Sequence, residues 1–425
     1  MKRVLAIIRI GLFAFITMSV FNPDPGLCAS SHRKVKKNHS VRKAKPLSRV
    51  HSRVVKQQGK QKTRELSIAS PPDDAQSLNK QALLLYGQGK YAEAELLYRR
   101  SLVIRKNRLG AEHPLVATSL NNLALLLDAQ GRYASAEPLS RRALAIDEKA
   151  LGTGHLDVAT DLNNLAALLQ AQGKYAEAEP LYSRSLSIRE KQLGSDHADV
   201  AQSLNNLAAL LQDQGKYTEA EPLYRRSLAI REKLFGNEHP DVAPGLNNLA
   251  SLLKTQGKYA EAEPLYRRSL AIREKLFSNK HPLVAISLNN LAELLQAQGK
   301  YAEAEPLYRR SLAIREKVFA GNHPLVATSL NNLAGLLQAQ GKYAEAEPLY
   351  RHSLIINKKA LGANHPSVAM SMNNLAGLLQ EQGKSDQAEL LYRRALAIDE
   401  KVLGKDHPQT ITIRNNFNAR SKTLK

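Results

Sequence analysis

The sequence predicts an all-α fold: a right-handed superhelical solenoid of eight helix-turn-helix repeats plus a C-terminal capping helix. The segment QGKYAEAEPLYRRSLAIREK occurs twice without change, at 256–275 and 298–317. A glycine recurs every 42 residues from Gly89 to Gly383, and a histidine keeps the same step from His113 to His407. Two stretches of each unit place apolar residues at helical spacing. Such a unit cannot bury its apolar face alone, so successive units must stack.

The unit that starts at Pro282 shows how each element is predicted. A first helix begins at Pro282, because proline is tolerated in the first turn, where its missing N–H has no helical partner. Its apolar stripe runs from Val284 to Leu295. Gln298-Gly299-Lys300 ends this helix, and a second helix is expected from about Tyr301 to Lys317. Repetition of this unit predicts eight helix pairs over residues 74–404.

The N-terminus has the features of a secretory signal peptide over residues 1–29. A positively charged start precedes a short apolar run at 10–21, and small residues follow up to Ala29. The run is shorter than the roughly 20 apolar residues of a spanning helix. These features predict an exported protein, periplasmic or secreted. Basic residues directly after the run keep three alternatives open: a membrane anchor at residues 4–21, an organelle transit peptide, or a cytoplasmic protein.

Residues 30–73 are predicted to be a basic, disordered linker. Residues 1–66 hold 16 Lys and Arg against two acids, whereas the rest of the chain is only mildly basic. The linker has too few large apolar residues to fold alone. It is suited to weak electrostatic contact with anionic surfaces. Residues 31–66 contain no aromatic residue to stack on bases, so we expect no specific nucleic-acid site.

Two parts of the array depart from the common unit. The first and last units carry Leu96 and Leu390 where the other units have proline, as expected for capping units. Residues 405–425 are predicted to form a C-terminal cap helix and tail. Pro244 falls inside the predicted first helix of the fifth unit, and an interior proline kinks a helix, so we expect a bend there.

These residues give the unit a resemblance to the tetratricopeptide repeat. Asn290-Leu291-Ala292, Gly299, Tyr301, Ala304, Tyr308 and Ser311-Leu312 stand where that family has its packing residues. The usual repeat is about 34 residues long. The 42-residue form, with NNLA, QGKYAEAEPLYRRSLAIREK and HP-x-VA, resembles the repeats of kinesin light chains and their bacterial relatives. Kinesin light chains also have a heptad coiled coil, which this sequence lacks.

The sequence does not predict an enzyme. The histidines lie one repeat apart, which is too far for ligands of one metal ion, so a capping role beside proline is expected instead. Glutamates such as Glu303 and Glu305 lie two residues apart and point to different faces of a helix. The chain has no phosphate-binding glycine loop and no nucleophile elbow motif. We expect no cofactor, no metal and no small-molecule substrate.

The expected function is that of a protein–protein interaction scaffold with a concave groove. The resemblance implies that the first helices line this groove and that one asparagine of each unit faces it. An amide can donate to a carbonyl and accept from an N–H, and so can hold an extended backbone. An alternative is that these side chains bind neighbouring helices. The asparagines predicted to bind peptide are Asn122, Asn164, Asn206, Asn248, Asn290, Asn332 and Asn374.

Specificity is expected from groove positions that differ between units. One such position holds Leu125, Ala167, Ala209, Ser251 and Glu293 in successive units. The charged residues assigned to the groove make it neutral to slightly acidic, which favours a polar or basic peptide over an acidic one. A competing class of function is structural, namely an envelope-tethered spacer or a self-assembling array held by the basic N-terminal arm.

Overall fold

The computed structural model describes residues 75–319 and 321–423, which form eight helix pairs and one final helix. These residues contain no β-strand. The predicted signal peptide and the whole of the predicted linker lie outside the described residues. The first helices of the pairs are α2 (Ala75–Gly87), α4 (Pro114–Ala129), α6 (Leu156–Ala171), α8 (Ala198–Asp213), α10 (Val242–Thr255), α12 (Pro282–Ala297), α14 (Pro324–Ala339) and α16 (Pro366–Glu381). The second helices are α3 (Tyr91–Leu109), α5 (Tyr133–Leu151), α7 (Tyr175–Leu193), α9 (Tyr217–Phe235), α11 (Tyr259–Leu276), α13 (Tyr301–Phe319), α15 (Tyr343–Leu361) and α17 (Ser385–Val402), and α18 (Pro408–Thr423) follows.

Local sequence sets the ends of these helices. α12 begins at Pro282, as predicted, and α13 begins at Tyr301. The turn between them is a Schellman motif: Gly299 N–H donates to Gln296 O at 2.9 Å, and Lys300 N–H donates to Leu295 O at 2.8 Å. This turn needs a positive φ, which is +74° at Gly299. Glycine adopts that conformation without the steric cost that other residues pay, which explains the glycine ladder.

Small residues hold the two helices of each pair together. Ala292 on α12 and Ala304 on α13 are fully buried, and Tyr308 packs in the same core. The hydroxyl of Ser311 donates a 2.8 Å hydrogen bond to the backbone carbonyl oxygen of Ala285 on α12. The serine therefore joins both helices at a contact that a larger side chain would force apart. The equivalent bond is made by Ser101, Ser185, Ser227, Ser269 and Ser353.

Arginines on the second helices join five of the pairs to the pair that follows, and three of these arginines are buried. Arg315 on α13 is 1% exposed. Its Nη1 donates to the carbonyl oxygen of Leu325 at 3.1 Å and to the hydroxyl of Ser329 at 3.0 Å, both on α14. A buried guanidinium needs such acceptors because an uncompensated charge in the interior is costly. The corresponding carbonyl contacts are made by Arg105, Arg189, Arg231 and Arg273.

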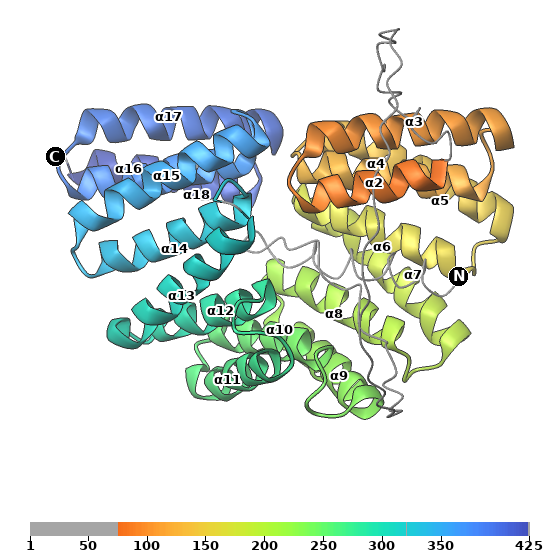
Figure 1. The fold of residues 1–425 in the computed structure, drawn as a ribbon, viewed down its shortest axis with the longest axis horizontal. Helices are drawn as coiled ribbons and strands as arrows, with labels where there is room; N and C mark the ends of the chain where they lie inside the picture. The colour runs from red at the N-terminus through yellow and green to blue at the C-terminus, as the bar shows by residue number, and fades with distance from the viewer. Residues whose placement is uncertain (1–74, 320, 424–425) are drawn as a thin grey trace, which may run out of the picture.

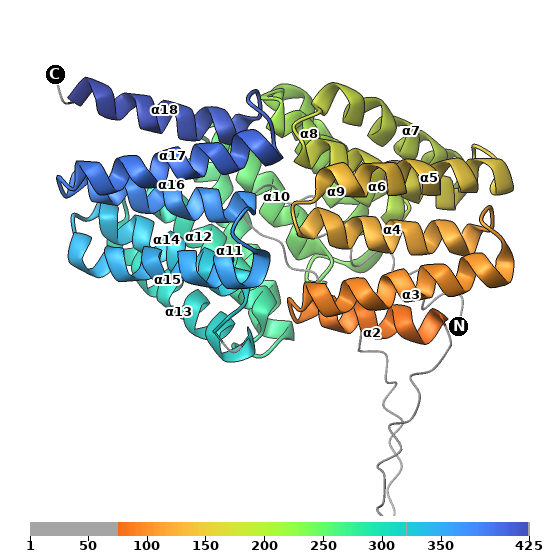
Figure 2. The ribbon, with the colours of Figure 1, turned by 90° about the horizontal axis from the view of Figure 1, so that it is seen from above.

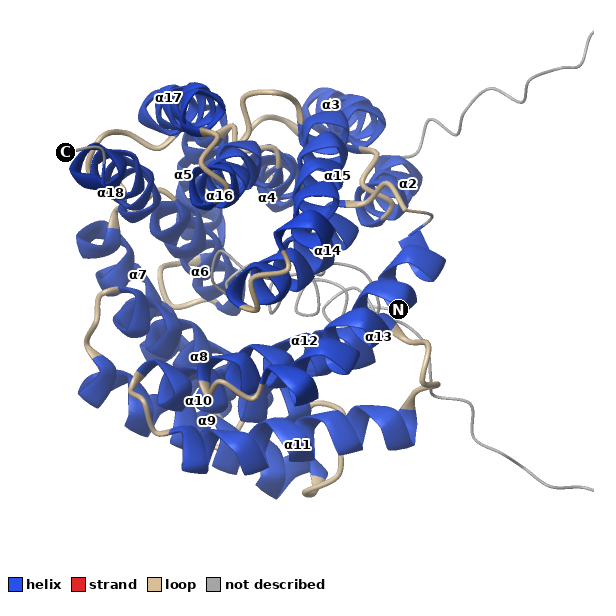
Figure 3. Cartoon of the chain, turned by 90° about the vertical axis from the view of Figure 1, so that its left-hand side faces the viewer, coloured by secondary structure: helices blue, strands red, loops and turns tan. Residues whose placement is uncertain are grey.

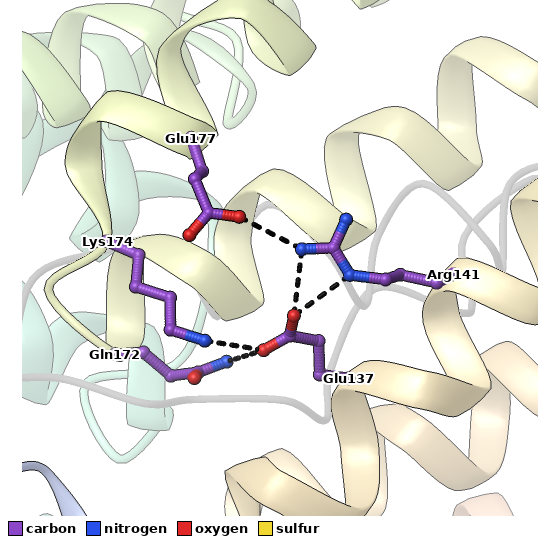
Figure 4. Close-up of polar contacts among 5 residues, drawn as sticks. All are labelled: Glu137, Arg141, Gln172, Lys174 and Glu177. Atoms are coloured by element: carbon purple, nitrogen blue, oxygen red, sulfur yellow. Dashed lines mark hydrogen bonds and ion pairs between the residues drawn. The ribbon is translucent and has the colours of Figure 1, made fainter.

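A second link between pairs is a network of charges along the second helices (Figure 4). Glu137 on α5 accepts hydrogen bonds from Arg141 and from Gln172 and Lys174, which lie in the turn of the next pair. Arg141 also donates to Glu177 on α7 at 3.0 Å. Burial of the Glu137 carboxylate opposes ionisation, but these hydrogen bonds outweigh it and lower its pKa to about 2. Ion pairs from the following turn recur at Glu95, Glu221, Glu263, Glu305 and Glu347.

The structure corrects the expected role of Pro244. α10 begins at Val242, two residues later in its unit than α12 begins in its own. Pro244 therefore lies in the first turn of α10. The first N–H groups of a helix have no partner within it, so proline removes no helical hydrogen bond there. The expectation that Pro244 is an interior proline was wrong, because the helix begins two residues later than expected.

The solenoid comes back on itself (Figures 1 and 2). The N-terminal pairs, in orange, lie beside the C-terminal pairs, in blue, and the middle pairs, in green, form the opposite side. A side chain on Gly131 would come within 3.0 Å of Pro366 and 3.2 Å of His365. The same approach occurs three times, each time between a turn glycine and a histidine 234 residues later. We call these contacts the seam: Gly89 with His323, Gly131 with His365, and Gly173 with His407.

Candidate functional site

The first helix of each pair lies on the inner side of the solenoid (Figure 3). α6, α8, α12 and α14 lie toward the centre of this view, whereas α7, α9, α11 and α13 lie toward the outside. One position on the inner helices changes from pair to pair and is partly exposed in every pair but one, where Ala167 is buried. We call it the variable position: Leu125, Ala167, Ala209, Ser251, Glu293, Gly335 and Gly377.

The seven predicted peptide-binding asparagines all lie on inner helices, but they differ in exposure. Asn164, Asn206 and Asn248 are buried. The other four are partly exposed: Asn122, Asn290, Asn332 and Asn374. A partner that approaches the inner surface therefore meets an amide at only four of the seven positions. Peptide binding by these residues stays a prediction.

Several of these asparagines hydrogen-bond to the neighbouring pair, which was the alternative expectation. The Nδ2 atom of Asn206 donates to Oδ1 of Asn163 at 2.7 Å, and Asn248 donates to Asn205 at 2.6 Å. Asn332 donates to both Asn289 and Glu293, at 2.9 and 3.2 Å. These amides connect successive inner helices, so they are part of the framework.

A tyrosine of the second helix also fixes a side chain on the inner helix of the same pair. In α13, the hydroxyl of Tyr308 donates to Oε1 of Gln296 at 3.0 Å. The same bond joins Tyr182 to Gln170, Tyr224 to Gln212 and Tyr350 to Gln338.

The second pair lacks this tyrosine–glutamine contact. It has Asp128 on α4 in place of the glutamine and Ser140 on α5 in place of the tyrosine. The smaller serine leaves a hollow whose polar lining is Asn121, Asp128, Ser140 and Asn164, and whose other walls are aliphatic. Burial raises the pKa of the Asp128 carboxyl to about 7. Among the described pairs, only this one changes both members of the tyrosine–glutamine contact.

Four other charged side chains of the inner surface have partners in neighbouring pairs. Lys254 pairs with Glu293 at 3.0 Å. Asp213 accepts from Gln170 at 2.7 Å, and Glu381 accepts from Gln338 at 2.8 Å. Burial raises the pKa of the Asp213 carboxyl, and the bond from Gln170 only partly offsets this. Acidic groups outnumber basic ones at these positions, as the sequence indicated.

The histidine ladder caps helices. In α4 the Nδ1 atom of His113 accepts a hydrogen bond of 3.1 Å from Leu115 N–H, which satisfies one free donor of the first turn. His281 makes the same bond to Leu283 N–H at 3.2 Å. The predicted capping role is thereby confirmed. No group of three or more His, Cys, Asp or Glu in residues 75–319 and 321–423 is placed to hold a metal ion.

Two features of the structure were not recognised in the sequence. The buried arginines look like ordinary charged residues of an amphipathic helix, and only packing shows that they reach the next pair. The hollow did have a signal, because Asp128 and Ser140 break the repeat together. The meaning of this double change is clear only from the structure, because in four other pairs the tyrosine and glutamine at these two positions are hydrogen-bonded to each other.

None of the helices in the described part of the chain is both long and apolar enough to span a membrane. No curated protein matches the chain. Among solved structures, a putative kinesin light chain of Podosopora anserina with nearly identical TPR-like repeats is 32% identical; the match covers 48% of this chain and 97% of that chain, with a TM-score of 0.41. BtubC from P. vanneervenii is 25% identical over 58% of this chain and 94% of that chain, with a TM-score of 0.44.

A Rap protein complexed with competence and sporulation factor is 15% identical and shows the same kind of fold, covering 82% of this chain and 98% of that chain with a TM-score of 0.50. The family model for the tetratricopeptide repeat matches residues 73–149, 157–233, 199–275, 241–317, 283–354 and 325–401. These matches span most of the chain, and the paired helices of the structure follow them. The chain therefore belongs to the tetratricopeptide repeat family, and its repeats are similar in sequence to those of the putative kinesin light chain.

Proposed function

We propose that the chain is a non-catalytic interaction scaffold whose inner surface binds an extended segment of a protein or peptide. The observation that carries this proposal is the variable position. It changes from leucine to alanine, serine, glutamate and glycine along the array, while the residues that build the framework repeat almost unchanged. Because this position is partly exposed in every pair but one, its residues are suited to distinguish successive side chains of a partner.

The charges of this surface favour a polar or basic partner. We assign four acidic residues and two basic residues to this surface: Asp128, Asp213, Glu293 and Glu381 against Lys80 and Lys254. An acidic segment would meet repulsion at several pairs, whereas a basic one would find complementary charge. The chain does no chemistry of its own in this proposal. Its inner polar groups are bonded to one another between pairs, which suits a rigid binding surface.

The Rap protein, which has a similar fold, is itself complexed with competence and sporulation factor, and this supports the proposal. At 15% identity the likeness concerns the fold alone. The partner of this chain has to be found by experiment.

The test is selection of peptides from a random display library on the full chain, followed by affinity measurement. Ala209→Arg places a long side chain at the variable position of α8, and affinity for selected peptides should fall at least about tenfold. Ala271→Arg on α11 is the matched control, because Ala271 is exposed on an outer helix. The affinity of this control variant for the selected peptides should equal that of the unmodified chain. Selected peptides that bind both variants equally well would place binding elsewhere, and a library that yields no binder would count against the scaffold.

We also propose that the protein is exported, periplasmic or secreted, with its N-terminal segment removed after Ala29 or Ser30. This rests on the pattern of residues 1–29, which lie outside the described residues. The N-terminal residue of the protein recovered from fractionated cells tests it. A start near Ser30 outside the cytoplasm supports export, and an intact Met1 contradicts it.

A further inference from the structure

The hollow of the second pair is a local departure from the repeat. In four other pairs a tyrosine stands at the position of Ser140 and its hydroxyl donates to a glutamine, as Tyr182 does to Gln170 at 3.0 Å. Asp128 and Ser140 change both members of that contact together. The hollow has a free volume of about 10 Å³, enough for a single group about the size of a water molecule.

Two amide oxygens of residues that line the hollow are buried without a hydrogen-bond partner. Asn121 and Asn164 are each 7% exposed, and the Oδ1 atom of each has no hydrogen-bond partner. The Nδ2 atom of Asn121 is used elsewhere, since it donates to Oδ1 of Asp161 at 2.5 Å. The carboxylate of Asp128 adds two further acceptor oxygens. Buried acceptors left without donors are costly, so this lining is complementary to a donor group that carries positive charge.

We infer that the hollow between α4, α5 and α6 binds a primary ammonium group, presented as the end of a lysine side chain by the segment held on the inner surface. An ammonium is compact and has three donors, which match Asp128 and the two amide oxygens. A guanidinium is a larger planar group and does not fit this volume. A water molecule has two donors and leaves the carboxylate charge uncompensated. The lysine carrier rests on the proposed function, whereas ammonium binding by the hollow does not.

The pH dependence of this site follows from its neighbours. Asp128 ionises at a pKa of about 7 because burial disfavours the charge, so the hollow should bind ammonium more strongly at pH 8 than at pH 6. The ammonium stays protonated over this range. The titratable and charged groups that lie nearby are Tyr86 on α2, Tyr133 on α5, Asp161 on α6, Tyr182 on α7, His365 beside Ala129, and Asp399 on α17. Burial raises the pKa of these tyrosines, which keeps them neutral here.

The test uses n-butylammonium chloride, which copies the end of a lysine side chain, and the full chain. The carboxyl ¹³C resonance of Asp128, assigned with Asp128→Asn, should shift saturably at pH 8, and the apparent Kd should rise at pH 6. The double variant Asp128→Gln with Ser140→Tyr recreates the contact of the other pairs, so it should fold normally and lose the binding at least about tenfold. The inference would be overturned if sodium chloride shifted the Asp128 resonance equally, or if the shift with n-butylammonium did not saturate. Retention of n-butylammonium binding by the double variant would also overturn it.

Library peptides separate this inference from the proposed function. Peptides selected on the full chain should contain a lysine whose replacement by norleucine weakens binding to the full chain but not to the double variant. Binders without such a lysine, together with no butylammonium binding, would remove the inference and leave the scaffold. Saturable butylammonium binding without any peptide binder would support the hollow and count against the scaffold.

Discussion

The Nε2 atom of His365 lies 3.3 Å from the carbonyl oxygen of Ala129, although the two residues are 236 positions apart. The Nδ1 atom of the same ring accepts from Ser367 N–H at 3.0 Å, so the neutral ring carries its proton on Nε2 and donates it to Ala129. One imidazole thereby caps α16 and joins the last pairs to the first ones. His407 makes the corresponding bond to the carbonyl of Ala171.

The seam should weaken as the pH falls from about 6.5 toward 4. Burial lowers the pKa of His365 to about 4, although the bond to Ala129 opposes this, and burial followed by the charge of Arg315 lowers the pKa of His323 to about 4. An opened form takes up protons near the ordinary histidine pKa of about 6.5, so lowering the pH through this window favours it. Small-angle X-ray scattering should therefore show a larger radius of gyration at pH 5 than at pH 7.5.

The variant His365→Asn tests the cause of that response. Asparagine keeps a helix cap but has no titratable ring, so the change in radius between pH 7.5 and pH 5 should shrink. His197→Asn is the matched control, because His197 caps α8 in the same way but is exposed and lies outside the seam. Equal responses from both variants would show that the seam histidines do not govern opening.

A methyl group added in the seam should lower the free energy of unfolding more than the same group added in a turn with no close neighbours. Gly131 and Gly257 have φ values of +68° and +75°, so alanine at either position adds backbone strain of about 1–2 kcal/mol. Only at Gly131 would the new Cβ meet Pro366 at 3.0 Å, whereas nothing lies within 4 Å of it at Gly257. Gly131→Ala should lower the free energy of unfolding by about 1–3 kcal/mol more than Gly257→Ala does, or open the seam. Denaturant titration and scattering of both variants decide this, and equal losses without opening would contradict the contact.

Filling the hollow should stabilise the fold in a pH-dependent way. Asp128→Gln with Ser140→Tyr removes a buried carboxylate whose pKa burial raises to about 7, and it restores a tyrosine–glutamine hydrogen bond. A raised pKa means that ionisation destabilises the folded state increasingly from about pH 4 up to pH 7. The gain in unfolding free energy should therefore be larger at pH 8, about 1–3 kcal/mol, than at pH 4. Denaturant titrations at both pH values measure it, and an equal gain at both would exclude the carboxylate as the cause.

Most of the fold was predictable because every unit repeats the same signals for where its helices begin and end. The period, the turn glycine and the first-turn proline fixed α12 and α13 to within two residues of the observed ends. The error at Pro244 came from applying the common boundary to a unit that begins later. The seam joins residues that are 234 positions apart. A 42-residue repeat does not predict which residues meet there, because this depends on the curvature that accumulates over several pairs.

The candidate site was only partly predictable for a related reason. The sequence placed the asparagines on the inner helices, but exposure and bonding differ among identical residues: Asn206 is buried and bonded to Asn163, whereas Asn290 is partly exposed. Whether an asparagine is buried and bonded or partly exposed depends on the side chains that surround it on neighbouring helices. A ladder of one residue type therefore contains both framework and candidate binding positions.

The network of Figure 4 should contribute measurably to stability at neutral pH. Glu137→Ala removes the acceptor of Arg141, Gln172 and Lys174, and should cost about 1 kcal/mol, less at high salt. Because the folded-state pKa of Glu137 is lowered to about 2, this contribution is complete above its ordinary value of 4.5 and is lost as the pH falls toward 2. Glu179→Ala is the control, since Ser183 replaces the arginine of that pair, and its loss should be smaller. Chemical denaturation at two salt concentrations compares them, and equal losses would mean that the arginine adds nothing.

The two kinds of asparagine should separate stability from binding. Asn206 donates to Asn163 at 2.7 Å and accepts from Gln202 at 2.8 Å, so Asn206→Ala leaves two buried polar groups unsatisfied and should cost about 1–3 kcal/mol. Asn290 is partly exposed on α12, and Asn290→Ala should change stability by less than about 0.5 kcal/mol while it weakens binding of library-selected peptides. Thermal unfolding and peptide titration of both variants check this. If Asn290→Ala binds as tightly as the unmodified chain, the exposed amides do not hold the partner, and the variable position alone would have to account for recognition.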